Sequence, residues 1–195
     1  MPISEAYMID SEARKASKVV LSGGIILYPT DTIWGMGCDA TNEKAVQRVY
    51  DLKQRDDSKS MLVLVNGTQM LKQYLNAFPP KAQELIASAK KPTTIIYPGA
   101  RKLAGNLLAE DGSVGIRITS DPFCQQLLAF TGKPIVSTSA NYSGDPSPSL
   151  FNEIHPEILH RVDHVVNWRQ DEKDPSQSSA IIKLEEGGGI SIIRP

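Results

Sequence analysis

Tyr28-Pro29-Thr30-Asp31-Thr32 follows directly on the apolar run Gly24 to Leu27, and this junction indicates a sheet protein with ligand groups at its strand ends. The apolar run is typical of a buried strand. Pro29 lacks a backbone N–H, so it ends the pairing of that strand. Hydroxyl and carboxyl side chains then follow where the strand opens into a loop, the place where sheet proteins put ligand-binding groups. We therefore expect a functional segment here.

Polar side chains recur at other predicted strands. An arginine within the apolar run Val114–Ile118 is costly unless it meets an anion, so we expect Arg117 to face a cleft. Ser137 to Gly144 forms a dense polar cluster, which on its own reads equally well as a plain Ser/Asn turn. Lys53 and Arg55 close the next predicted helix, where cations ordinarily complement the helix dipole. Together with polar groups at Ser178-Ser179 and Arg194, these segments predict a site for an anionic ligand with several parts.

The remaining chain predicts an α/β fold, a single domain over residues 1–195 with an open, twisted, mixed sheet and flanking helices. Helix starts are expected at Asp10-Ser11-Glu12, Asn42, Pro79-Pro80 and Asp121-Pro122. Further strands are expected at Met61–Val65, Thr93–Tyr97 and Pro134–Val136. Gly187-Gly188-Gly189 separates two apolar runs, as a hairpin would.

Composition limits the class of protein. The chain has 195 residues, 41% hydrophobic and 22% charged, which is typical of a globular protein with a sizeable core. Its net charge is −1, so any RNA contact needs a local patch, such as Lys53, Arg55 and Lys59, or the second cluster Lys90, Lys91, Arg101 and Lys102. No apolar stretch is long enough to cross a bilayer, and we expect no leader segment. With two cysteines, Cys38 and Cys124, we expect free thiols and a cytoplasmic location.

The motifs Y-P-T-D-T-x-x-G-x-G, K-x-R, V-G-I-R, S-T-S-A-N-x-S-G and I-I-R-P occur here in order, from Tyr28 to Pro195. In this combination the chain resembles the YrdC/TsaC-type threonylcarbamoyl-AMP synthases, in their short single-domain form. The resemblance implies a YrdC-like fold with a site on the concave face of the sheet. It also implies a nucleotidyltransferase that makes L-threonylcarbamoyl-AMP from L-threonine, bicarbonate and ATP, releasing pyrophosphate. The product feeds the threonylcarbamoyladenosine modification of tRNA.

The resemblance also implies roles for individual residues. Catalytic positions are Lys53 and Arg55, and Arg55 also contacts the nucleotide. Threonine would be bound by Thr32, Arg117, Ser137 and Ser179, with the Arg117 fork matching its carboxylate. The further ATP-binding positions are Lys59, Ser113, Ser139, Asn141, Ser147 and Arg194. Mg²⁺ is expected with ATP, carried by the phosphates because no carboxylate cluster is visible and no metal-ligand set is predicted. Serine, which lacks only one methyl group worth about 1 kcal/mol, would be harder to reject than analogues that lack the hydroxyl group.

The chain departs from the family pattern at a few positions. Lys90-Lys91 replaces the usual Pro-Gly before Pro92, Asp56 stands where proline is common, Ala180 replaces a threonine, and Lys183 stands where aspartate is frequent. The loop Asp145–Ser149 is rich in proline and serine and is expected to act as a flap over ATP. The chain ends at Pro195, so we expect no additional C-terminal domain.

Other functions have weaker support. Gly35-x-Gly37-x-x-Ala40 matches a loose dinucleotide pattern, but polar residues separate it from the next helix. His160 and His164 could share a helix face, where a solvated surface is favoured over a metal site. The alternative function is a double-stranded RNA or tRNA-binding module without catalysis, which leaves Thr32, Ser137, Ser139 and Asn141 unexplained. A carbamoyl-adenylate domain of a hydrogenase-maturation carbamoyltransferase is the third candidate. Transfer proteins that take up the adenylate are expected downstream partners.

Overall fold

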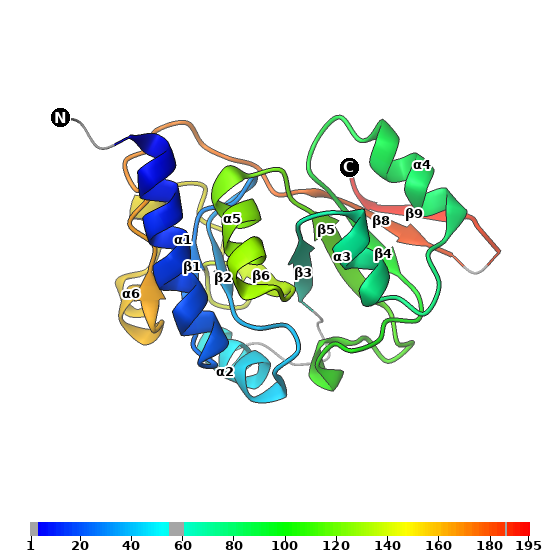
Figure 1. Cartoon of the computed structure of the whole chain (residues 1–195), viewed down its shortest axis with the longest axis horizontal. Coiled ribbons are helices and arrows are strands. Elements are labelled where there is room, and N and C mark those ends of the chain that lie inside the picture. The colour runs from blue at the N-terminus through cyan, green and yellow to red at the C-terminus, as the bar shows by residue number, and fades with distance from the viewer. Residues whose placement is uncertain (1–3, 55–60, 186) are drawn as a thin grey trace.

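The structure is a computed structural model that describes residues 4–54, 61–185 and 187–195 (Figure 1). Its strands are β1 Ile26–Tyr28, β2 Gly35–Gly37, β3 Leu62–Val65, β4 Thr93–Tyr97, β5 Val114–Ile118, β6 Ile135–Ser139, β7 His164–Val165, β8 Ala180–Leu184 and β9 Ile190–Arg194. Its helices are α1 Glu5–Leu21, α2 Glu43–Lys53, α3 Thr68–Gln73, α4 Pro80–Ser88, α5 Pro122–Thr131 and α6 Pro156–Arg161, with short 3₁₀ turns η1 Gly105–Leu107 and η2 Phe151–Glu153.

Within the described residues the strands form one sheet in the order β7-β1-β2-β6-β3-β5-β4-β8-β9. The pairs β1–β7, β3–β5 and β4–β8 are parallel, whereas β1–β2, β2–β6, β3–β6, β4–β5 and β8–β9 are antiparallel. The expected open mixed sheet with flanking helices is therefore confirmed. The β8–β9 hairpin is also confirmed, and it places the C-terminal strand beside β8, which begins directly after Ser179.

Two apolar clusters hold the helices to the sheet. Helices α1 and α5 pack side by side (Figure 1), and their buried residues meet β1, β3 and β6 in one cluster that includes Ala16, Phe123 and Leu127. Helix α2 contributes Val46, Val49 and other residues to the second cluster. Because side chains alternate along a strand, β4 and β5 bury Ile95 and Ile116 in that cluster, whereas Thr94, Ile96 and Arg117 point to the opposite face.

Most expected helix starts are confirmed by their caps. The Asn42 side chain accepts hydrogen bonds from the backbone of Lys44 and Ala45, and Asp121 accepts one from the Cys124 N–H. The expected start at Asp10 is wrong, because α1 begins at Glu5 with Ser4 as its cap. Asp10 lies inside the helix, where its carboxylate forms an ion pair with Arg14 one turn later at 2.8 Å.

Buried Glu12 ties α1 to the segment after β7. Its carboxylate accepts hydrogen bonds from Lys15 Nζ at 2.6 Å and from the Asn167 N–H at 2.9 Å. His164 Nε2 lies 3.7 Å away, and it belongs to β7, so the expectation that His160 and His164 share a helix face is wrong. Burial raises the pKa of Glu12, but the hydrogen bonds outweigh it and leave that pKa below its ordinary value.

We expect Glu12→Gln to lower the free energy of unfolding by about 2 kcal/mol at pH 7, the usual worth of hydrogen bonds to a charged group. The folded-state pKa is depressed, so this stabilisation is present above the unfolded-state pKa and is lost as pH falls through the folded-state pKa. Urea unfolding should show that the variant and wild type differ less in free energy of unfolding below pH 4.5 than at pH 7. Glu84→Gln, in an exposed pair with Lys81, is the matched control. A difference that is equal at both pH values would contradict the prediction.

The Gly35-x-Gly37 pattern belongs to β2 and not to a nucleotide-binding turn. Strand β2 pairs with β1 on one side and β6 on the other. A Cβ built at Gly37 would collide with the backbone carbonyl oxygen of Val136 on β6. Glycine is therefore required here because two backbones approach closely.

Gly37→Ala should destabilise the protein by about 3 kcal/mol, the upper range for overpacking, because the obstructing atom is backbone and cannot rotate away. Gly67→Ala is the control, since no atom lies within 4 Å of the place that its new Cβ would occupy and its φ of 168° is ordinary extended backbone. Thermal unfolding of both variants tests this. Equal melting temperatures would show that β6 moves aside at little cost.

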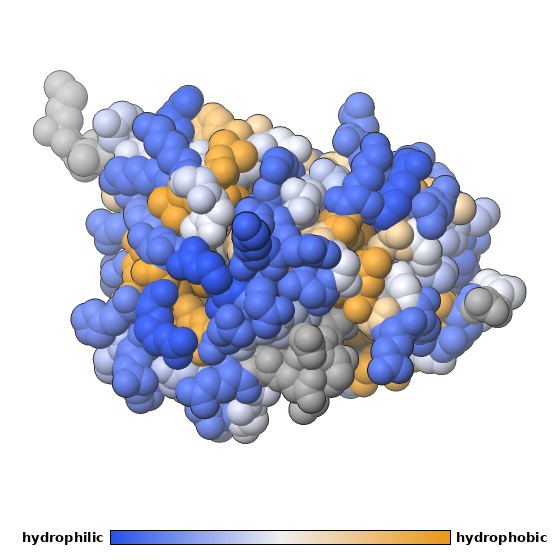
Figure 2. Space-filling view, turned by 90° about the horizontal axis from the view of Figure 1, so that it is seen from below, coloured by the Kyte–Doolittle hydropathy of each residue, from blue (hydrophilic) through white to orange (hydrophobic). Residues whose placement is uncertain are grey.

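On the face seen in Figure 2, hydrophilic residues predominate and hydrophobic residues reach the surface in separated patches. Among the helices that the structure describes, none has both the length and the apolar character needed to cross a membrane.

Candidate active site

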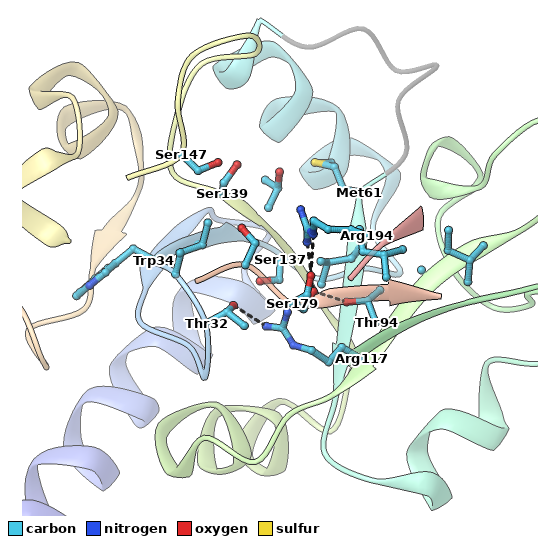
Figure 3. A pocket seen from close by; sticks show the side chains of 18 residues that line it. Thr32, Trp34, Met61, Thr94, Arg117, Ser137, Ser139, Ser147, Ser179 and Arg194 are labelled. Carbon is cyan, nitrogen blue, oxygen red and sulfur yellow. Dashed lines mark hydrogen bonds between the residues drawn. The ribbon is translucent and has the colours of Figure 1, made fainter. Parts of the chain in front are cut away.

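A cavity of about 240 Å³ lies on the face of the central strands opposite the core beneath α4 (Figure 3). Side-chain alternation explains its lining. Strand β4 turns Thr94 and Ile96 toward the cavity, and the neighbouring strand β5 turns Arg117 toward it. The loop after β1, the polar part of β6, the start of β8 and the end of β9 complete the wall. The site is thus built from strand ends that are far apart in the sequence.

The structure brings most of the predicted residues together around this cavity. The lining includes Thr32, Arg117, Ser137, Ser139, Ser147, Ser179 and Arg194. In Figure 3, Thr32 and Arg117 lie on one side of the cavity, and Ser139 and Ser147 lie together on the other. The cavity therefore has an arginine end and a hydroxyl-rich end.

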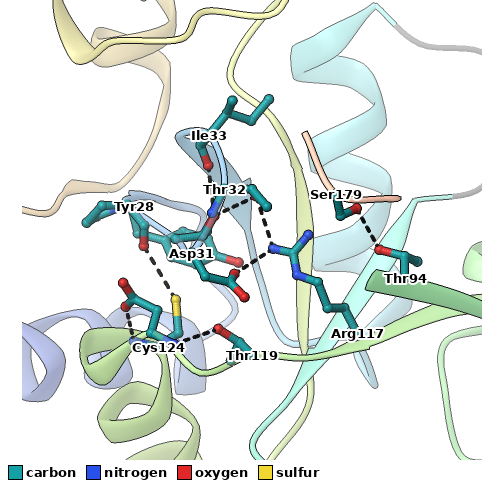
Figure 4. A network of polar contacts seen from close by, with 12 residues as sticks. Tyr28, Asp31, Thr32, Ile33, Thr94, Arg117, Thr119, Cys124 and Ser179 are labelled. Atoms are coloured by element: carbon teal, nitrogen blue, oxygen red, sulfur yellow. Dashed lines mark hydrogen bonds and ion pairs between the residues drawn. The ribbon is translucent and has the colours of Figure 1, made fainter. Parts of the chain in front are cut away.

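Arg117 supplies a buried positive charge. The residue is only 2% exposed, and its Nη2 donates to Asp31 Oδ1 at 3.0 Å and to Thr32 Oγ1 at 3.2 Å (Figure 4). Its Nε is buried and has no hydrogen-bond partner among the described residues. A buried donor without a partner is costly, so the guanidinium is suited to an anionic ligand that completes its hydrogen bonding.

The loop after β1 is held by its own hydroxyl groups. Thr30 Oγ1 donates to the Ile33 carbonyl oxygen at 2.9 Å and accepts from the Thr32 N–H at 3.0 Å. It also lies 2.9 Å from Thr32 Oγ1. These contacts aim the Thr32 hydroxyl at Arg117, so a threonine side chain is placed beside the positive charge.

Ser179 and Arg194 form the wall contributed by the C-terminal hairpin. Ser179 is 2% exposed, and its Oγ lies 2.9 Å from Thr94 Oγ1. Arg194 Nε donates to the Ser179 carbonyl oxygen at 2.7 Å. Burial, and then the like charge of Arg117, lowers the pKa of Arg194. Arginine remains protonated even so. Two arginines that repel each other across one cavity favour a ligand carrying negative charge.

Asn141 faces a neighbouring cavity of about 630 Å³, which also includes Ser147 in its lining. The Asn141 Nδ2 donates to the backbone oxygens of Tyr142 and Asp145, while Oδ1 is buried without a partner among the described residues. Asp145 and Ser147 both line this second cavity. The expectation that the Asp145–Ser149 loop closes over ATP stays a prediction.

Lys53 does not line the cavity. The side chain is 1% exposed at the end of α2, and its Nζ donates to the carbonyl oxygens of Ser139 at 2.5 Å and Asn141 at 2.7 Å. Its visible contacts therefore hold the backbone of the polar segment that follows β6. A direct role of Lys53 in catalysis stays a prediction. Arg55 and Lys59 lie outside the described residues, as does Asp56.

Ser113, a predicted ATP-binding residue, does not line the cavity of Arg117 and Arg194. It lines a separate cavity together with Asp111 and Lys183, and Lys183 Nζ lies 3.0 Å from Asp111 Oδ2. Lys183 is the lysine that stands where the family often has aspartate. Lys90 and Lys91 line another cavity beneath α4, whose walls are the opposite side chains of β4 and β5.

Three residues in or next to the site had no role in the sequence analysis; of these, only Thr94 lines the cavity itself. Asp31 was quoted in the first motif without a function, yet it pairs with Arg117 across 86 positions. Thr94 was covered only by the expected strand Thr93–Tyr97. Its alternation with buried Ile95 was the available signal for a cavity-facing hydroxyl. Arg169, which contacts the Thr30 carbonyl, had no signal in the local sequence.

Comparison with known proteins agrees with this arrangement. The Sua5_yciO_yrdC family model, described as "Telomere recombination", matches residues 18–195. The chain belongs to the Sua5/YciO/YrdC family. The family resemblance read from the motifs is thereby confirmed.

Members of the Sua5/YciO/YrdC family similar to this chain include proteins named for one activity. The threonylcarbamoyl-AMP synthase of Xanthomonas euvesicatoria pv. vesicatoria is 32% identical over 156 residues, covering 78% of this chain and 83% of that protein. A putative threonylcarbamoyl-AMP synthase of Methanocaldococcus jannaschii is 33% identical, covering 97% of this chain and 91% of that protein.

A solved structure of the same family shares the fold. P. abyssi Sua5 complexed with L-threonine aligns with a TM-score of 0.84 at 21% identity, covering 95% of this chain and 54% of that chain. This chain thus spans about half the length of that Sua5 protein. The structural likeness supports the YrdC-like fold.

Proposed function

We propose that this protein synthesises L-threonylcarbamoyl-AMP from L-threonine, bicarbonate and ATP, with release of pyrophosphate, for the threonylcarbamoyladenosine modification of tRNA. One observation carries the proposal: buried Arg117, with an unpartnered Nε, shares a single cavity with Arg194 and the hydroxyl-rich segment of β6. Such a cavity suits a ligand with a carboxylate at one end and a phosphate at the other. The relatives named threonylcarbamoyl-AMP synthase support the same reaction.

The arginine end is proposed to bind threonine. Arg117 would bind the carboxylate, because its planar fork matches two carboxylate oxygens in a way that lysine cannot. Thr32, Ser137 and Ser179 supply hydrogen-bonding groups around it, and Ile96 and Ile181 supply apolar surface. The P. abyssi Sua5 protein binds L-threonine in its crystal structure, which supports placing the same amino acid here.

The hydroxyl-rich end is proposed to bind ATP. Ser139 and Ser147 line this end, and Asn141 Oδ1 is left to accept a hydrogen bond from a nucleotide hydroxyl or amine. Arg194 contributes charge toward the phosphates. Arg55 and Lys59 are assigned to the phosphates by family resemblance alone. Mg²⁺ would enter with ATP and screen the phosphate charge; the described lining of the cavity holds no Asp or Glu, so its ligands would come from the phosphates and water.

The proposed chemistry has two steps. The threonine amine adds to bicarbonate and water leaves, giving a carbamate. A carbamate oxygen then bonds to the α-phosphorus while the bond from that phosphorus to the bridging oxygen breaks, and its electron pair leaves on pyrophosphate. For phosphoryl-type transfer, catalysis is mostly positioning and neutralisation of charge. Arg194 would provide this charge, together with Arg55 and Lys59, which are assigned by family resemblance.

Location and partners follow from the same proposal. We place the reaction in the cytoplasm, where tRNA is modified; buried, free Cys38 and Cys124 are compatible with a reducing compartment. The adenylate would pass to proteins that transfer threonylcarbamoyl to tRNA. Residues 1–195 are proposed to act as one YrdC-like unit.

The test measures pyrophosphate release from ATP, bicarbonate and Mg²⁺ with and without L-threonine, and detects the adenylate by mass. Release that requires both threonine and bicarbonate, and that survives moderate salt, is the expected result. No threonine-dependent release, together with RNA binding that weakens steeply with salt, would overturn the proposal in favour of an RNA-binding module.

A further inference from the structure

Arg169 contacts the loop after β1 and is not part of the cavity lining. It lies in the segment between β7 and β8 and has a left-handed backbone with φ of 61°. Its Nη1 donates to the Thr30 carbonyl oxygen at 3.2 Å and to Asp121 Oδ2 at 2.7 Å, and its Nε donates to Glu172 Oε1 at 2.6 Å. One guanidinium therefore joins three segments of the chain.

Asp121 gives this contact a rigid base. The residue is 7% exposed, and its other carboxylate oxygen caps α5 by accepting from the Cys124 N–H at 2.9 Å. Burial raises the pKa of Asp121, and the charge of Arg169 acts against that rise. The loop after β1 is thus fastened through Arg169 to the start of a packed helix.

The Thr30 carbonyl oxygen, which Arg169 holds, belongs to the residue that positions Thr32 next to Arg117. Thr30 holds the N–H and the hydroxyl of Thr32 through its own Oγ1, and Thr32 Oγ1 accepts from Arg117. Displacing Thr30 would therefore move the Thr32 hydroxyl relative to the guanidinium of Arg117. Small displacements of binding groups matter, because a misplacement of about 1 Å can lower reaction rate by about 100-fold.

We propose that Arg169 is a positioning residue for the threonine-binding loop, residues 29–33, acting through the Thr30 carbonyl and Asp121 without contacting substrate. This inference rests on the proposed function for its kinetic consequence only. The fork geometry is essential, since a lysine ammonium keeps the charge without presenting several fixed donors.

A neighbouring thiol offers a readout of loop position that does not depend on activity. Cys124 Sγ lies 3.4 Å from the Pro29 carbonyl oxygen, at the base of the same loop (Figure 4), and Cys124 is 1% exposed. Cys38 is 0% exposed in the other apolar cluster. These are the only two cysteines of the chain. Alkylation of Cys124 reports local opening of the loop, and alkylation of Cys38 reports opening of the core.

The experiment compares wild type with Arg169→Ala, Arg169→Lys and Asp121→Asn, which keeps an oxygen to cap α5. Arg14→Ala, which removes another arginine from an ion pair with 60% of its side chain exposed, is the control. For Arg169→Ala we expect alkylation of Cys124 to accelerate by about tenfold or more with Cys38 unchanged. We expect the KM for threonine to rise by about tenfold with the KM for ATP within about twofold. For Arg169→Lys, the alkylation rate of Cys124 and the KM for threonine should lie between those of wild type and Arg169→Ala. For Arg14→Ala, both quantities should match wild type.

Unchanged alkylation of Cys124 in Arg169→Ala would overturn the inference whatever the activity. Parallel acceleration at Cys38 and Cys124 would also overturn it, since that pattern means general destabilisation. Failure of the proposed function looks different: wild type itself would release no pyrophosphate in response to threonine, while Cys124 would still respond to the substitution.

Discussion

Replacing Arg117 with alanine should lower kcat/KM for L-threonine by about 100-fold or more, the effect of truncating one partner of a buried, hydrogen-bonded charge pair. The guanidinium is 2% exposed, so water cannot replace it well at the carboxylate of the substrate. Most of the loss should appear in the KM for threonine, because this group binds the amino acid and does not touch the reacting phosphate in the proposed arrangement. Initial rates of pyrophosphate release over a threonine series measure the effect.

The Arg117 prediction needs controls for folding, since Asp31 would be left without its partner and its side chain is only 10% exposed. Breaking a buried pair this way typically costs about 3–5 kcal/mol. The double variant Asp31→Asn/Arg117→Met removes both charges and should recover unfolding stability without recovering activity. Arg117→Lys keeps the charge and should retain an intermediate KM. A threonine KM close to wild type in well-folded Arg117→Ala would contradict the assignment.

The sequence predicted those features of the site that depend on residues close together in the chain. Pro29 ends β1, and the hydroxyl groups that follow lie at the cavity as expected. Arg117 could be assigned to a cleft because a charged side chain within an apolar strand is costly to bury unless it meets an anion. The caps at Asn42 and Asp121 were also readable, since each acts on an N–H two or three residues away. Family resemblance then supplied the roles that local physics could not.

The rest depended on contacts between distant segments. Strand β6 continues through Ser139, although Ser137 to Ser139 resemble a polar turn, because β2 and β3 pair with them and override local preference. Asp31 and Arg169 carry no local sign of their partners 86 and 48 positions away in sequence. The sequence also does not determine whether a lysine at a helix end contacts a phosphate or the protein's own carbonyl oxygens. Lys53 lies at the end of α2, and its Nζ contacts two such carbonyl oxygens.

Lys53→Met should lower the free energy of unfolding by about 3 kcal/mol, because the carbonyl oxygens of Ser139 and Asn141 would both lose a charged donor in a buried place. Methionine is unbranched and only one heavy atom shorter than lysine, so packing changes little. Activity should fall by about 100-fold through displacement of the segment that carries Ser139 and Asn141. Urea unfolding and pyrophosphate release on the same preparation measure both effects.

Amide hydrogen exchange distinguishes this structural role of Lys53 from direct contact with ATP. If Nζ holds the segment after β6, exchange should accelerate in Lys53→Met at the amides of Ala140 and Ser143, which donate to Trp34 and to Lys53 backbone oxygens. Lys133→Met is the matched control, because that lysine pairs with Asp39 and 42% of its side chain is exposed. Lost activity with unchanged stability and unchanged exchange would contradict this role. Lys53 would then bind the phosphates when ATP is present, and its contacts with the two carbonyl oxygens would belong only to the ATP-free protein.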